Sequence, residues 1–474
     1  MGADSPAADA AFDVIIIGAG PAGIFTALEL TELKPDASIA MLDIGRAIAR
    51  RECPARKTGR CVHCVPCAIV HGWAGAGAFS DGKLSLSDEV GGHITEYIPH
   101  EDAMALIRHA DDIYLRFGAP VTVHGLNSPK VDEIAYEASR YNIRLIPCPV
   151  RHLGTENAAR VLGNMHTALD GKIEFFELTT AQDLLVEDGR IAGVTVTARD
   201  GSVRTLKAPK IVAAPGRGGA AWLSRQIQRL GLGTKHNEVD IGVRVEVPNA
   251  ILDHLTKHLY EAKLVYYSDT YENKVRTFCM NPGGVVSQEH YEGGLAVVNG
   301  HSYADPALRT ANTNFAVLVS TGFTEPFNQP IEYGRYIAQL ANMLTGGPIM
   351  VQRLGDLMHG HRTNSDRLSK STTIPTLATA VPGDLSFALP SRHLTSIIEA
   401  LRAFDHLAPG LFDRNTLLYG VEVKFYSSKV RVNERFETEI PGLYAIGDGA
   451  GITRGLMQAS CTGIAVARDI ASAR

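Results

Sequence analysis

The chain has 474 residues, of which 45% are apolar and 20% are charged, and its formal net charge is −5. This length exceeds that of one ordinary domain and predicts either two domains or one large fold with an insertion. The mild acidity argues against a nucleic-acid partner, and no apolar run approaches the roughly 18 residues that cross a bilayer. We therefore expect a globular cytoplasmic protein without a membrane segment.

The N-terminal part predicts a strand, a glycine turn and a helix, in that order. Residues 1–11 are small and polar and are expected to be a disordered extension. Residues 12–17 are β-branched and apolar, as in a buried parallel strand, and residues 24–30 have helical spacing. In a dinucleotide-binding turn one glycine permits the tight turn, a second admits a pyrophosphate and a third lets helix and strand pack closely. The turn residues are Gly18, Ala19, Gly20, Pro21, Ala22 and Gly23.

The next predicted strand, residues 38–42, ends at an acid. Asp43 stands where the dinucleotide pattern places a carboxylate for the ribose hydroxyls. Ile44 and Arg46 follow it and complete this part of the predicted cofactor site. The strand, the helix and the acid together make a chance glycine turn an inadequate explanation, so the sequence predicts dinucleotide binding.

The middle of the chain alternates strands and turns. Strands are expected over residues 172–180, 181–186 and 191–197, with a hairpin turn between the last two. A further strand leads to Ala214, Pro215 and Gly216, where the spacing also fits a second nucleotide turn, but no complete βαβ unit follows. We therefore expect no separate NAD(P)H domain, although NAD(P)H could still act as a transient donor. Residues 236–414 mix strands and helices and are expected to form an inserted α+β substrate domain.

A second glycine-rich element near the C-terminus favours FAD over NAD. Residues 443–446 predict a strand that ends at Gly447 and Asp448, and a helix of small residues follows. A carboxylate there could accept a hydrogen bond from the ribityl chain, and the helix N-terminus would favour negative charge on the reduced flavin. The predicted fold is thus α/β, with a Rossmann-type FAD-binding domain split between residues 12–235 and 415–474.

The chain resembles the glutathione-reductase-type FAD superfamily and, more narrowly, an uncharacterised family of FAD-dependent dehydrogenases of bacteria and archaea. The strings that carry this resemblance are GAGAFSDGKL at 75–84, DIGVRVE at 240–246, TFCMNPGG at 277–284 and GDGAGITRG at 447–455. The resemblance implies FAD and redox chemistry, but it supplies no substrate. It also implies further cofactor contacts at Gly75, Ala76, Gly77, Phe79, Ser80, Lys83, Asp183, Leu184, Gly455, Leu456, Met457, Gln458 and Ala459.

Four of the seven cysteines crowd into residues 53–67: Cys53, Cys61, Cys64 and Cys67. Four thiolates at this spacing could hold Zn²⁺ or an iron–sulfur cluster. A pair such as Cys61 and Cys64 could instead form a redox couple that exchanges electrons with the flavin. A cysteine-rich loop without metal is the third interpretation, and all three stay open.

Arg454, His359 and His361 are the candidate catalytic residues. Arg454 lies between Asp448 and the helix expected to face the flavin, where a guanidinium could support negative charge. The histidines have a pKa suited to acid–base work. Arg244 is a weaker candidate for binding a carboxylate or supporting the negative charge of the flavin, since arginines more commonly form salt bridges.

Three hypotheses follow for the function. The first is an FAD-dependent oxidoreductase in which a small-molecule substrate passes a hydride to flavin N5. The second is an electron-transfer flavoprotein that uses a metal centre or dithiol in residues 53–67. The third is a flavin-binding sensor without turnover. The sequence leaves the substrate, the electron acceptor and a homodimeric state undecided.

Overall fold

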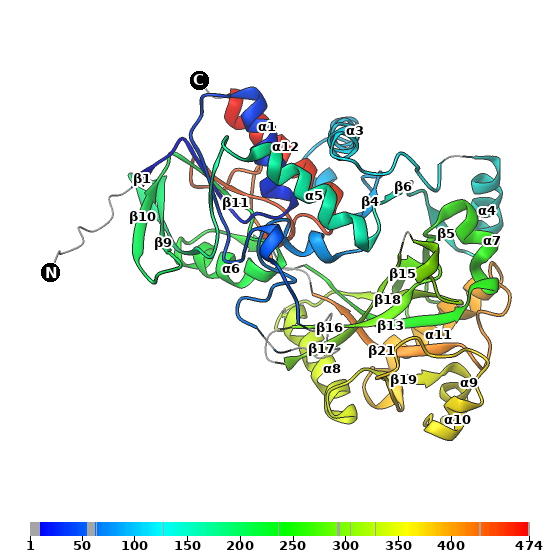
Figure 1. Ribbon diagram of the computed structural model, residues 1–474. Coiled ribbons are helices and arrows are strands. Elements are labelled where there is room, and N and C mark those ends of the chain that lie inside the picture. Colours follow the sequence, from blue (N-terminus) through cyan, green and yellow to red (C-terminus); the bar gives the residue numbers. More distant parts are fainter. Residues whose placement is uncertain are drawn as a thin grey trace. The chain divides into compact units, whose positions relative to one another are not determined.

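The computed structural model describes residues 10–54, 62, 64–126, 128–235, 237–291, 294–303, 305–327, 329–425 and 428–472 (Figure 1). The chain forms two compact units, each made of separate segments. Unit 1 consists of Met1–Val121, Thr155–His236 and Ser427–Arg474, and unit 2 of Thr122–Gly154 and Asn237–Tyr426. The mixed α/β architecture confirms the predicted fold class.

The two units divide the chain differently from the expected domains at two places. The sequence predicts that residues 122–154 belong to the FAD-binding domain, but β5 (Arg144–Ile146) pairs with β14 (Lys263–Tyr267) in unit 2. It predicts the same for residues 415–426, but β21 (Leu417–Lys424) lies between β19 (Met350–Arg353) and β13 (Val239–Pro248) in the unit 2 sheet. Strand pairing between segments distant in the sequence decides both assignments.

Unit 1 is built on a five-stranded parallel sheet. Its order is β23 (Leu443–Ala445), β11 (Lys210–Ala213), β2 (Val14–Ile17), β3 (Ile39–Leu42) and β7 (Glu174–Phe176). The three central strands are apolar and almost wholly buried, as expected for a parallel sheet covered on both faces. Four long helices belong to this unit: α1 (Pro21–Leu33), α3 (His100–Arg116), α5 (Thr155–Leu169) and α12 (Leu456–Ser472).

A second sheet in unit 1 has the order β1 (Ala10–Ala11), β10 (Val203–Lys207), β9 (Arg190–Thr197) and β8 (Thr180–Glu187). Helix α6 (Ala220–Arg229) belongs to the same unit. The expected disordered extension reached residue 11, whereas Ala10 and Ala11 pair in parallel with β10, because their backbone completes the edge of this sheet. Residues 1–9 lie outside the described part of the chain.

Unit 2 is built on an eight-stranded sheet. Its order is β20 (Val381–Pro382), β19, β21, β13, β18 (Asn312–Thr321), β15 (Lys274–Asn281), β14 and β5. Its principal helices are α4 (Pro129–Ser139), α7 (Asn249–Leu259), α8 (Pro330–Thr345) and α11 (Ser391–Asp405). Strand β13 alternates apolar and polar side chains, and its apolar side chains belong to the large core cluster of this unit.

The remaining elements are short. The hairpin β16 (Val285–His290) and β17 (Ala296–His301) belongs to unit 2, as do β6 (Val150–His152), α9 (Leu354–Met358) and α10 (Ser365–Ser369). Unit 1 also contains β4 (Lys83–Ser85), β12 (Thr234–Lys235) and β22 (Lys429–Val430). Among the described helices, none combines the length and apolar composition needed to span a bilayer.

Candidate functional site

The glycine turn between β2 and α1 uses its three glycines for two different purposes. A Cβ on Gly18 would lie 2.1 Å from the carbonyl oxygen of Ala214, and one on Gly23 would lie 2.0 Å from that of Gly18. These two glycines are required by packing. A Cβ on Gly20 would meet nothing within 4 Å, so the middle of the turn faces open space.

That open space adjoins the N-terminus of α1. Gly20 is the N-cap residue and Pro21 occupies the first helical position. The first-turn amides of a helix have no intrahelical acceptor, and the helix dipole adds positive charge at this end. Because an anion can therefore be held here by backbone N–H groups, the turn fits a pyrophosphate, and Gly20 leaves room for it.

Asp43, at the end of β3, ties this turn to two neighbouring loops. Its Oδ2 accepts from the amide of Ala19 at 3.0 Å, and its Oδ1 accepts from the amides of Gly45 and Gly72, each at 2.7 Å. A carboxylate offers about four acceptor positions, so one remains on Oδ2 for a ribose hydroxyl. Most of its bonding capacity organises the backbone, a role that sequence reasoning did not assign to it.

The glycine-rich loop predicted to approach the pyrophosphate lies against the turn. The amide of Ala74 donates to the carbonyl of Ala19 at 2.7 Å, and Ala74 itself has a φ of +70°. The 3₁₀ helix η2 (Gly75–Phe79) begins at the next residue, and a Cβ on Gly75 would come within 3.3 Å of the Gly20 Cα. The predicted contact residues of this loop therefore start beside the open space at Gly20.

Asp448 begins the 3₁₀ helix η8 (Asp448–Ala450), which follows β23 after Ile446 and Gly447. Its Oδ1 accepts from the Thr453 hydroxyl at 2.7 Å and from the Gly455 amide at 3.2 Å, and Arg217 lies 3.8 Å from its Oδ2. Burial raises the pKa of this carboxyl above its usual range, although Arg217 and Thr453 oppose the shift. The Asp448 carboxylate is thus a partly buried acceptor, and its Oδ2 accepts fewer hydrogen bonds than its Oδ1.

Helices α1 and α12 lie side by side (Figure 1). The Thr26 hydroxyl donates to the Gly463 carbonyl at 3.3 Å, and further along both helices the Lys34 ammonium donates to the Ile470 carbonyl at 3.2 Å. Their N-termini are therefore at the same end. Gly455, immediately before α12, has a φ of +140°, and a Cβ on it would meet nothing within 4 Å. Unit 1 thus presents two neighbouring helix N-termini, each preceded by a glycine that opens onto free space.

All of the predicted cofactor residues fall within unit 1. Because the carboxyl ends of parallel strands meet at one edge of a sheet, β2, β3, β11 and β23 deliver the turn, Asp43, Ala214 and Gly447 to that same edge. Sequence reasoning found these positions because each follows an apolar run directly.

Some of the residues predicted to contact the cofactor form hydrogen bonds or ion pairs with other protein groups. The Gln458 side-chain amide donates to the carbonyls of Asp88 at 3.0 Å and Val90 at 3.2 Å. The Leu184 amide donates to Gln226 Oε1 at 3.0 Å, at a bulge in β8. An adenine bound there would have to displace that bond. Lys83 is largely buried, 3.3 Å from Asp81.

The cysteine loop is only partly described. Cys53, Cys64 and Cys67 are free thiols, whereas Cys61 lies outside the described residues. Within the part of the chain that is described, no three histidine, cysteine or acidic side chains are grouped so as to hold a metal ion. The metal and dithiol interpretations stay predictions, which iron, zinc and sulfide analysis of the purified protein would test.

The candidate catalytic residues divide between the units. Arg454 lies in unit 1, where its amide donates to the Gly91 carbonyl at 2.7 Å. His359 and His361 lie in unit 2, are exposed and stack with ring centroids 6.1 Å apart. Nothing in their surroundings favours a catalytic role for the two histidines, which stays a prediction. Arg244 forms a fully buried two-pronged ion pair with Glu422.

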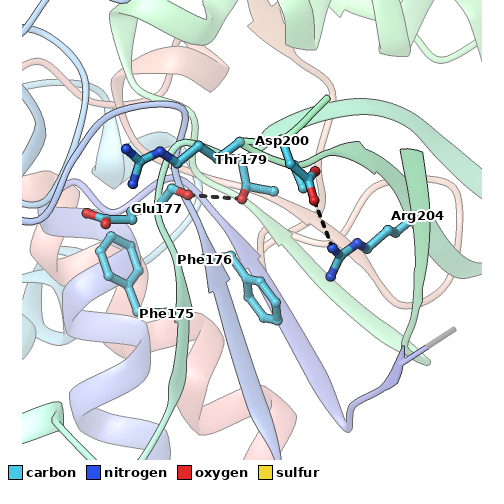
Figure 2. Close-up of a pocket in the computed structure, with 8 residues that line it drawn as sticks. Phe175, Phe176, Glu177, Thr179, Asp200 and Arg204 are labelled. Atoms are coloured by element: carbon cyan, nitrogen blue, oxygen red, sulfur yellow. Dashed lines mark hydrogen bonds and ion pairs between the residues drawn. The ribbon is translucent and has the colours of Figure 1, made fainter. Parts of the chain in front are cut away.

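An open hollow of about 500 Å³ lies on unit 1 and contains none of these residues. Figure 2 shows Asp200 paired with Arg204 on one side and Thr179 bonded to Glu177 on the other. Phe175 and Phe176 of β7 complete its labelled lining. Asp200 and Arg204 pair with each other, and none of the glycine turn residues lines the hollow, so we assign it no role.

Two protein families match the chain. Residues 95–237 match the FAD binding domain family, and residues 238–425 match the family described as FAD-dependent protein, C-terminal domain-like. The chain is an FAD-dependent oxidoreductase. A protein of Clostridium beijerinckii described as uncharacterised is 28% identical over 96% of this chain and 80% of its own length.

The solved structures that this chain resembles share little sequence with it. The 3-ketosteroid-Δ4-(5α)-dehydrogenase of Rhodococcus jostii is 13% identical, with a TM-score of 0.45, over 98% of both chains. A formate oxidase is 12% identical with the same TM-score and coverage. Quinol fumarate reductase of E. coli is 13% identical over 97% of this chain and 70% of its own, with a TM-score of 0.41. Likenesses this remote say nothing of the substrate of this chain.

Proposed function

We propose that this FAD-dependent oxidoreductase is of the dehydrogenase or oxidase type and takes a hydride from a small-molecule substrate. The observation that carries the proposal is the pair of parallel helix N-termini of α1 and α12, each opened by a glycine. Bound FAD would supply the hydride acceptor at flavin N5. The finer likeness to glutathione-reductase-type flavoproteins stays a prediction.

The residues of unit 1 would bind and orient the two ends of the cofactor. Gly20 and the first-turn amides of α1 would hold the pyrophosphate, and Asp43 would accept from the ribose. Asp448 would accept from the ribityl chain. The N-terminus of α12 would favour negative charge on the reduced ring, because a helix dipole stabilises an anion at that end.

A substitution at Gly20 tests cofactor binding. The Cβ of Gly20→Val would meet no protein atom within 4 Å, so we expect a folded protein that is purified without its yellow colour. Gly23→Ala is the matched control, because its Cβ would strike the Gly18 carbonyl and impair folding itself. The measurements are the visible spectrum and the thermal unfolding midpoint. A Gly20→Val protein that retains FAD would contradict the proposed pyrophosphate position.

Turnover is tested separately from binding. The holoprotein is mixed anaerobically with NADH, NADPH or members of a metabolite panel while the flavin absorbance is followed. Bleaching by any of these donors identifies a reductant and excludes a sensor without turnover. An FAD-loaded protein that no donor bleaches would count against the dehydrogenase proposal while leaving FAD binding intact.

A further inference from the structure

Arg51 is a buried cation in unit 1 that sequence reasoning did not single out. Its residue exposure is 7%, and its guanidinium donates to three backbone carbonyls. Nε donates to Ala68 at 3.0 Å, Nη2 donates to Ile69 at 2.8 Å, and Nη1 donates to Trp73. The ring of Phe79 lies beneath the guanidinium, 4.8 Å from Cζ.

These partners are neutral, and Arg51 forms no ion pair with any described residue. Residues 55–61 and 63, which lie close to Arg51 in the sequence and outside the part of the chain that the structure describes, include no aspartate or glutamate. Asp43 acts on Arg51 only at longer range, and its carboxylate already accepts from three amides. Burial lowers the pKa of Arg51 to about 10, against the opposing electrostatic effects of Asp43 and Cys67. A buried charge that lacks a counterion is costly.

The groups that Arg51 holds belong to the loop beside the glycine turn. Trp73 directly precedes Ala74, whose amide donates to Ala19 within the turn. Phe79 ends η2, which starts next to Gly20. A Cβ on Gly72 would approach the Arg51 Cδ to 2.9 Å, so the loop is packed directly against this side chain.

We propose that Arg51 is a positioning residue whose buried charge is balanced by the pyrophosphate of FAD. It holds the loop from Ala68 to Phe79 in place beside the helix N-terminus and contributes a positive potential there. In the apoprotein this charge has no ion-pair partner among the described residues, and the bound dianion supplies one. This inference rests on the proposed position of FAD at Gly20.

The test compares Arg51→Met with the wild type in apoprotein from which FAD has been removed. We expect FAD and ADP, which shares the pyrophosphate but lacks the flavin, both to bind at least about tenfold more weakly, equivalent to ~1.4 kcal/mol. The apoprotein unfolding midpoint should fall little, because a costly buried charge is removed together with its hydrogen bonds. Arg51→Lys keeps the charge and should recover part of the affinity.

Two controls separate this role from others. Arg50→Met removes the same charge from an exposed side chain paired with Glu177 and should leave both affinities unchanged. Cys67→Ser should also leave them unchanged; a loss equal to that of Arg51→Met would make the Cys67 thiolate the counterion and overturn the proposal. It is also overturned if Arg51→Met weakens FAD but not ADP, or lowers apoprotein stability without changing either affinity.

Failure of the inference can be told from failure of the proposed function. If the wild-type apoprotein binds neither FAD nor ADP, the proposed pyrophosphate site itself is wrong. If the wild type binds both ligands and the Arg51→Met variant binds them equally well, only the proposed role of Arg51 is wrong.

Discussion

Among single residues, Arg244 and Glu422 form a buried ion pair in the core of unit 2. Arg244 and Glu422 are both fully buried and joined by two hydrogen bonds of 2.8 Å. Asn314 accepts from the same guanidinium at 2.8 Å, and Lys424 lies 2.9 Å from Glu422. A buried ion pair contributes little net stability, but its remaining partner is costly once the pair is broken.

Glu422→Gln should therefore lower the free energy of unfolding by about 3–5 kcal/mol, because it leaves Arg244 buried without a counterion. Asp366→Asn is the control, since Asp366 pairs with Lys370 at 2.8 Å with both side chains about 70% exposed. That change should cost under about 1 kcal/mol. Chemical denaturation measures both, and equal effects would contradict the role of burial.

Asp448 makes stability depend on pH in the opposite sense from a salt-bridged acid. Folding raises the pKa of its carboxyl, so the folded state holds the proton more tightly than the unfolded state. The resulting stabilisation is complete below the ordinary carboxyl pKa and is lost as pH rises through the folded-state value.

Asp448→Asn should thus raise the stability of the apoprotein at pH 7, by on the order of 1 kcal/mol, while weakening its binding of FAD. The gain should vanish near pH 3, where the wild-type carboxyl is protonated in both states. Unfolding midpoints measured across this pH range give the comparison. A gain that persisted at low pH would point to packing instead of ionisation.

At the scale of elements, the approach of α1 to α12 depends on a missing side chain. A Cβ on Gly463 would lie 2.2 Å from the Ala22 carbonyl oxygen and 2.9 Å from the Thr26 amide. Since backbone atoms cannot move aside cheaply, the helices can pack this closely only with glycine at that position. Their contact holds the two N-termini at one end of unit 1.

Gly463→Ala should separate the two helices and lower the free energy of unfolding by about 1–3 kcal/mol, with a parallel loss of FAD affinity. Gly163→Ala in α5 is the matched control, because its Cβ would find its nearest neighbour at 3.8 Å. Better helix propensity should make that variant as stable as the wild type or up to about 1 kcal/mol more stable. Thermal unfolding distinguishes them, and similar midpoints would contradict the close packing.

At the scale of the whole molecule, each unit has its own sheet and its own apolar core. Both are assembled from separate segments, so neither corresponds to one continuous stretch of sequence. A molecule of this kind is not expected to unfold in one two-state step.

We expect calorimetry of the apoprotein to show two transitions, of which added FAD raises only one. A ligand at a hundred times its Kd stabilises the unit that binds it by about 2.7 kcal/mol. Hydrogen exchange would assign the shifted transition through protection of residues 18–23, 72–79 and 447–456. A single transition that moves as a whole would show that the units unfold together.

Local sequence determined the cofactor-binding elements. Residues 12–17, the glycine turn and Asp43 could be recognised because an apolar strand, a turn and an acid follow one another directly in the chain. The same holds for β23, the strand that leads to Gly447 and Asp448. Predicting FAD from these elements succeeded because the contacts that define them are local or follow from the polarity of parallel strands.

The tertiary structure decided what depends on contacts between distant segments. Residues 122–154 and 415–426 belong to unit 2 because their strands pair there. Arg51 resembles the other basic residues of its neighbourhood in sequence, and only the loop folded over it removes its charge from water. The glycine turn can be recognised in the sequence, whereas the burial of Arg51 and the balance of its charge arise only when the chain folds around that side chain.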